Sequence, residues 1–190
     1  MKAISELLDA TTARALPVVR AVTPDQLTAP TPCADYDVRA LVNHLLQVIV
    51  NFRALAAKQD ADFSTTPDLT TGDWQGAFEE EAARLAKAWA EPGAEDGTSG
   101  SLGFPARTVG HMVLGDLTVH VWDLARATGQ AYDPDPDVVT ELDRALTEMA
   151  PTARAWGAFG EPVSLPEDAP AFHRVLATTG RDPHWSPRAK

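Results

Sequence analysis

Apolar side chains recur every three or four residues along most of this 190-residue chain. This spacing predicts helices that bury one face and expose the other. The clearest stripe lies within residues 38–58 and consists of Val38, Leu41, Val42, Leu45, Val48, Ile49 and Phe52. Less regular patterns predict further helices over 2–20, 74–90, 106–128 and 137–156, and a short helix over 171–178.

Residues with strong backbone preferences mark the ends of these predicted helices. Asp37 and Asp73 are suited to accept hydrogen bonds from the first turn of the helix that follows each of them. Gly129 is suited to the left-handed backbone that ends a helix. Proline lacks the backbone donor that a helix uses, so Pro17 is expected to kink or loosen its helix unless tertiary packing tolerates it, and Pro151 to interrupt or kink its helix.

The connecting segments are polar or rich in Gly and Pro, as loops are. Residues 91–105 form the most Gly-rich loop, with a short extended piece expected near 102–104. No alternating strand pattern and no hairpin signal is evident. We therefore predict an all-α fold, and the length predicts one domain over 1–190.

Charge and composition narrow the range of partners. The formal net charge is -11, which excludes nucleic acid and an anionic membrane surface as expected partners. No apolar run approaches the roughly 18 residues that span a bilayer, and the N-terminus does not resemble a signal peptide. The single cysteine, Cys33, excludes an internal disulfide and fits a reducing compartment. We expect a cytoplasmic protein that acts on small molecules.

Asp116 and His120 are the main candidates for chemistry. They lie four residues apart in one predicted helix and therefore share a face, where they can bind one divalent metal. His44 adjoins the apolar stripe of another helix, where an unpaired imidazole is costly. Either these three residues share a metal ion, or they form a buried hydrogen-bond network; the residues alone favour the network.

Other residues near these candidates have open roles. His111 is half a turn out of phase with His120, so we expect it at the surface or at a pocket rim. Asp123 could hydrogen-bond the second ring nitrogen of His120, or it could pair with Arg126 or Arg39.

Cys33 and the C-terminal tail also offer candidate groups. Cys33 precedes a helix, whose N-terminus can lower the pKa of a thiol, but the favoured interpretation is a small residue packed in a turn. His173 and His184 lie in the tail, where solvated or structural roles are expected. If the tail folds over the site, His184 and Trp185 would line its mouth.

Three blocks of sequence together resemble the DinB-like family that includes mycothiol-dependent maleylpyruvate isomerase: TPCADYDVRALVNHLL, DLTVHVWDLARATGQ and GAFGEPVSLPEDAPAFHRVLATTGRDPHW. They resemble the actinobacterial metal-binding branch most. The resemblance implies a DinB-like four-helix bundle, here with an extra short C-terminal helix and a loop-rich tail. It also implies a divalent metal, commonly zinc or nickel, on His44, Asp116 and His120. The isomerase relatives tend to have Glu in place of Asp116, so the shorter side chain here would hold the metal closer to its helix or bind it in another mode.

The resemblance further implies a metal-dependent enzyme of transferase or isomerase type that uses a small thiol such as mycothiol. Its partners would be that thiol and a small-molecule substrate, and a homodimer is compatible with a helical bundle. Two alternatives stay open. One is a metal- or ligand-binding module without turnover, and the other is a hydrolase in which metal-bound water attacks the substrate.

Overall fold

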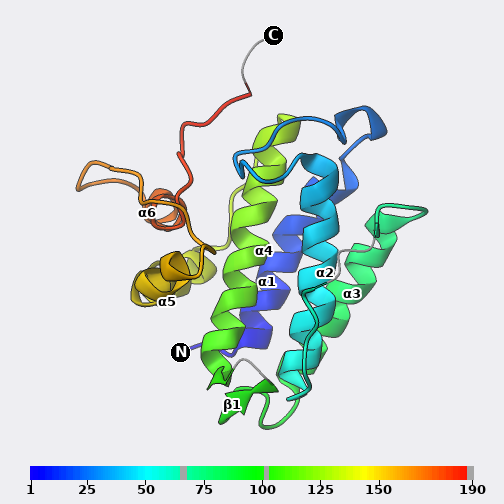
Figure 1. Ribbon diagram of the computed structural model, residues 1–190, viewed down its shortest axis with the longest axis vertical. Helices are drawn as coiled ribbons and strands as arrows, with labels where there is room; N and C mark the ends of the chain where they lie inside the picture. The colour runs from blue at the N-terminus through cyan, green and yellow to red at the C-terminus, as the bar shows by residue number, and fades with distance from the viewer. Residues whose placement is uncertain (65–67, 101–102, 188–190) are drawn as a thin grey trace.

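The computed structural model describes residues 1–64, 68–100 and 103–187. Four helices form a bundle in which both α1 and α2 pack against α3 and α4 (Figure 1). Their bounds are Ile4–Arg20 for α1, Val38–Ala56 for α2, Trp74–Ala90 for α3 and Ala106–Thr128 for α4. A 3-10 turn, η1, covers Pro24–Gln26. The predicted all-α bundle is therefore confirmed.

The helix ends follow the local chemistry of the sequence. Asp37 accepts a hydrogen bond from the amide of Ala40 at 2.8 Å, and Asp73 accepts one from Gly76 at 2.9 Å. Gly129 ends α4 with a φ of 72°. These three boundary predictions are confirmed because each depends on a single residue and its nearest neighbours.

Neither proline interrupts its helix, so the interruption that was one of two effects predicted for Pro151 is not found, and Pro17 is tolerated as the prediction allowed. Pro17 lies inside α1 and Pro151 inside α5 (Pro136–Ala155), and both helices continue through them. Each proline is near the C-terminal end of its helix, where packing of the preceding turns already fixes the backbone. The loss of one hydrogen bond is tolerated there.

The apolar stripe of α2 is buried along its whole length, as the periodicity predicts. On α3 the large apolar residues Trp74, Phe78, Leu85 and Trp89 are buried, whereas Ala77, which the same pattern includes, is exposed. Among the described residues no helix combines the length and the apolar composition that crossing a bilayer requires.

A small hairpin joins α3 to α4, which the sequence does not predict. β1 (Thr98–Ser99) pairs antiparallel with β2 (Phe104–Pro105). The Ser99 hydroxyl donates a hydrogen bond of 2.8 Å to the carbonyl of Leu55, which ties the hairpin to the end of α2. The extended piece expected near 102–104 is found in part as β2; residues 101–102 lie outside the described residues.

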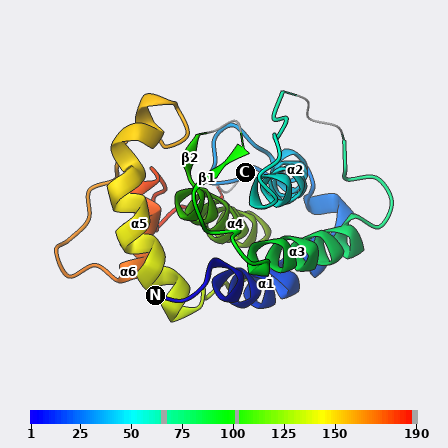
Figure 2. The same ribbon diagram turned by 90° about the horizontal axis from the view of Figure 1, so that it is seen from below.

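α5 and α6 (Ala171–Thr178) lie outside the bundle, on the side of α4 that faces away from α3 (Figure 2). The sequence predicts both helices but not their position. His111 of α4 shows the consequence: its Nε2 lies 2.8 Å from Glu141 Oε1 of α5, and its ring is buried. The prediction of a surface or rim position for His111 is wrong, because α5 covers that face of α4.

Candidate metal centre

A cavity of about 970 Å³ lies between the bundle and the segment that follows α4. One side, which we call the helical wall, consists of α2, α4 and the loop 32–36 before α2. The opposite side, the C-terminal wall, consists of the end of α5, the residues up to 160 and residues 179–181. The helical wall carries side chains spaced by four residues: His44, Val48 and Phe52 on α2, and Thr108, Met112, Asp116 and His120 on α4. Since such positions lie one above another on a helix, each helix presents a continuous row to the cavity.

The three residues predicted as metal ligands meet in this cavity. Asp116 Oδ1 lies 3.9 Å from His44 Nε2 and 3.5 Å from His120 Nε2. The two imidazole rings meet edge to face with centroids 4.9 Å apart. His120 is buried, whereas His44 and Asp116 are partly exposed, so this triad can be reached from the cavity. We refer to His44, Asp116 and His120 as the triad.

Two separations within the triad are longer than ordinary hydrogen bonds. A hydrogen bond between an imidazole and a carboxylate would be about 2.7–3.2 Å long, and both observed separations exceed this range. Two ligands on a tetrahedral zinc ion with bonds of about 2.1 Å lie roughly 3.4 Å apart. One ligand atom from each of the three residues lies within 4.8 Å of the other two, so the group could hold a metal ion.

Neighbouring side chains orient both histidines. Asp123 Oδ2 lies 3.0 Å from His120 Nδ1, and the Tyr36 hydroxyl lies 3.3 Å from His44 Nδ1. An ionised carboxylate can only accept, so Nδ1 of His120 donates to Asp123, and Nε2 is the ring atom that lies nearer to Asp116. Partners of this kind are typical of metal-binding histidines. Of the roles considered for Asp123, the hydrogen bond to His120 is confirmed.

The electrostatic environment keeps a negative charge at the triad. Burial alone would raise the pKa of Asp116, but His44, His120 and the Arg181 guanidinium outweigh burial and hold it below its ordinary value. Arg181 also lies 3.4 Å from Asp123 Oδ2. The ionised carboxylate is the form that binds a metal.

Cys33 lines the same cavity, within 4.8 Å of ligand atoms of His120 and Asp123. The Thr31 hydroxyl donates to the Cys33 carbonyl at 2.9 Å, which holds the residue in a tight turn. Burial raises the pKa of the Cys33 thiol. This shift is opposite in direction to the one that a helix N-terminus would cause, and the turn prediction is confirmed.

The tail does fold over the cavity, but with residues other than those expected. His184 is exposed, its ring lies 5.9 Å from that of His173, and neither residue lines the cavity. Trp185 accepts a hydrogen bond of 3.1 Å from Arg126 through its carbonyl and also lies outside the lining. Arg181 lines the cavity in their place.

Sequence reasoning missed Tyr36 and Arg181. Both lie in loops, where no periodicity relates them to the triad. One signal was available for Tyr36, since it directly precedes the helix-capping Asp37 and therefore lies near the start of the helix that carries His44. No sequence pattern near Arg181 indicates that its side chain lines the cavity that contains the triad.

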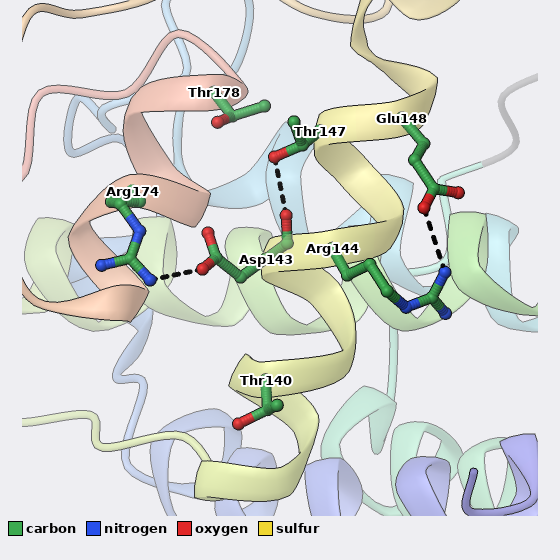
Figure 3. A pocket seen from close by; sticks show the side chains of 7 residues that line it. All are labelled: Thr140, Asp143, Arg144, Thr147, Glu148, Arg174 and Thr178. Carbon is green, nitrogen blue, oxygen red and sulfur yellow. Dashed lines mark hydrogen bonds and ion pairs between the residues drawn. The ribbon is translucent and has the colours of Figure 1, made fainter.

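A second depression, of about 480 Å³, lies between α5 and α6 (Figure 3). Arg174 pairs with Asp143 and Arg144 pairs with Glu148, so the charged side chains that line it are satisfied by one another. This depression contains none of the triad residues and offers no comparable set of convergent donors.

The chain matches the family of the mycothiol maleylpyruvate isomerase N-terminal domain over residues 8–125. It is also similar to uncharacterised proteins from two strains of Mycobacterium tuberculosis, each 31% identical over 164 residues. These alignments cover 83% of this chain and 86% of each relative. No solved structure matches the chain. The residues that match the family include the whole triad.

Proposed function

Since the chain belongs to the family of mycothiol maleylpyruvate isomerase N-terminal domains, we propose that it binds a divalent metal, zinc or nickel, through His44, Asp116 and His120. We further propose that the loaded protein is an enzyme that uses a small thiol such as mycothiol, of transferase or isomerase type. The observation that carries the proposal is the convergence of two Nε2 atoms and one carboxylate oxygen on the wall of a cavity that can hold a ligand.

The donor set fits a catalytic rather than a structural metal. Three protein ligands leave at least one coordination position for a small molecule, and the triad faces the cavity. A divalent metal bound there would lower the pKa of a thiol that coordinates it, so that the nucleophilic thiolate exists near neutral pH.

The chain's own residues contribute orientation and charge. Asp123 and Tyr36 fix the two imidazole rings so that both Nε2 atoms face Asp116. Arg181 places a positive charge beside Asp123 at the same end of the cavity, where it favours an anionic group on an incoming molecule.

Cobalt substitution tests the proposal. The protein is loaded with Co²⁺ in place of the native metal, a small thiol is added, and the near-ultraviolet sulfur-to-cobalt charge-transfer band is followed. We expect the band in the wild type and its loss in His120→Ala. The matched control is His173→Ala, which removes a histidine outside the cavity and should leave the band unchanged. No band in the wild type despite bound cobalt would contradict the use of a thiol.

Turnover is tested with the metal-loaded protein, mycothiol and a panel of electrophiles, with mass spectrometry of the products. In a transfer, a carbon–sulfur bond forms as the leaving group departs with its electron pair, and the thiol proton goes to solvent. In an isomerisation the thiol adds and leaves again, so the product keeps the mass of the substrate. A product of hydrolysis without any thiol adduct would favour the hydrolase alternative.

A further inference from the structure

The cavity has a second end that the triad does not use. Four aromatic side chains from separate segments gather there: Phe52 of α2, Phe63 of the following loop, Phe104 of β2 and Trp156 at the end of α5. The rings of Phe52 and Phe63 have centroids 5.8 Å apart, and those of Phe104 and Trp156 have centroids 5.1 Å apart. We call this group the aromatic end.

Two of these rings are exposed although they face a cavity. Phe63 is 43% exposed and Trp156 is 60% exposed, which makes them two of the few large apolar side chains at the surface of the described residues. Exposed aromatic groups that gather at one cavity are typical of a binding surface, since a partner that covers them removes apolar area from water.

An apolar path connects this end to the triad. Val48 lies between His44 and Phe52 on α2, and Met112 and Met149 line the same cavity. Eight residues separate His44 from Phe52, which corresponds to about 12 Å along a helix. One molecule of moderate length can therefore reach both ends.

The charge distribution distinguishes the two ends. Of the described residues that line the cavity, Arg181 is the one lysine or arginine, and it lies beside Asp123 at the triad end. No cation at the aromatic end would match a second anionic group about 12 Å from the triad. This end therefore does not suit a small substrate with negative charges at both of its ends.

We propose that the aromatic end binds an apolar arm of the substrate and thereby sets specificity. The substrate class is an electrophile that carries an aromatic ring, or a comparably bulky apolar group, about 12 Å from the reacting atom. The inference rests on the proposed function for what occupies the triad end, while binding at the aromatic end is independent of any metal.

The first experiment uses metal-free protein and the neutral fluorophore N-phenyl-1-naphthylamine, so that neither a metal nor a charge contributes. We expect binding to the wild type and at least tenfold weaker binding to the double variant Phe63→Ala, Trp156→Ala, whose exposed side chains can be removed without opening the core. The matched control is Val50→Ala, which removes an exposed apolar side chain outside the cavity.

Energy transfer gives the position of the probe. Trp156 beside the bound fluorophore should transfer excitation to it, and Trp156→Phe should lose most of that transfer while the probe still binds. Wild-type affinity in the double variant, or no binding by the wild-type protein, would overturn the proposal.

The second experiment links the two ends in the cobalt-loaded protein. Thiols with a phenyl group on a short or a long alkyl chain are compared by the charge-transfer band. We expect the long-chain thiol to bind more tightly than the short-chain thiol. The ratio of the two affinities should be about tenfold smaller in the double variant. Equal advantages in the two proteins would contradict the proposal. A protein that takes up no cobalt but binds the naphthylamine would overturn the proposed function and leave the aromatic end supported.

Discussion

The two walls of the cavity are built in different ways. The helical wall consists of regular, capped helices whose functional side chains follow a spacing of four residues. The C-terminal wall consists of a helix end, a loop and a tail. Arg181 pairs with Asp123 of α4, and the loop and the tail pack closely on each other at Gly160 and Gly180. The comparison indicates that helical spacing places Asp116 beside His120 and that packing of α2 on α4 adds His44, whereas the opposite wall depends on where a loop and the tail dock.

The largest effect on the C-terminal wall is expected from Gly180→Ala. Gly180 has a φ of 85°, and a Cβ there would lie 2.7 Å from the Cα of Gly160. An alanine at this position would have a strained left-handed backbone and would clash with the main chain of Gly160. Together these effects should lower the free energy of unfolding by about 3 kcal/mol. Urea denaturation provides the measurement.

The matched control is Gly157→Ala. Gly157 also has a positive φ, of 75°, but a Cβ there meets nothing within 4 Å. This variant should lose only about 1 kcal/mol. Equal losses in the two variants would show that close packing between the loop and the tail does not hold this wall.

Asp123→Asn tests the helical wall. Loss of the carboxylate that orients His120 should weaken metal binding by roughly 10–100-fold, because such partners fix the ring and raise the basicity of the ligand nitrogen. Competition with a chelator of known affinity measures the change. Asp60→Asn, at an exposed position, is the control. Wild-type affinity in Asp123→Asn would show that the hydrogen bond at 3.0 Å has no role in metal binding.

Glu141→Gln tests the junction between the two walls. Glu141 lies 2.8 Å from His111 and 3.1 Å from Arg107, so its loss should destabilise the fold by about 1.5 kcal/mol near pH 7. Denaturation of both proteins at a series of pH values gives the difference.

The sign of the pH dependence follows from the pKa of Glu141. Burial would raise it, but His111, Arg107 and Arg144 outweigh burial and hold it below the ordinary 4.5. The unfolded chain therefore binds a proton first on acidification. The stabilisation by Glu141 is complete above pH 4.5 and is lost as the pH falls through the folded-state pKa, so the two proteins should converge there. A difference that stays constant in acid would contradict this account.

The smallest effect is expected from Tyr36→Phe. The hydroxyl lies 3.3 Å from His44 Nδ1, but the two rings also stack with centroids 5.0 Å apart, and the phenylalanine keeps that stacking. Metal affinity should fall by about two- to threefold, which corresponds to about 0.5 kcal/mol. A loss as large as that of Asp123→Asn would mean that the hydroxyl, not the stacking, positions His44.

The same contrast explains what could be predicted from the sequence. Asp116 and His120 could be paired because four residues separate them on one helix, and His44 because it adjoins an apolar stripe. Their convergence needed the resemblance to a family, since periodicity does not say which helices pack together. The burial of His111 and the return of Arg181 to the cavity could not be predicted, because both depend on where α5 and the tail dock.

The central claim is that the triad binds a metal, and metal content tests it most directly. The wild type and His120→Ala are purified without chelator and without a nickel column, and zinc, nickel and iron are measured by elemental analysis. We predict close to one metal ion per chain in the wild type and almost none in His120→Ala, with His173→Ala like the wild type. A wild-type protein that contains no metal and takes none up on addition would contradict the claim, and the triad would then be a buried polar cluster.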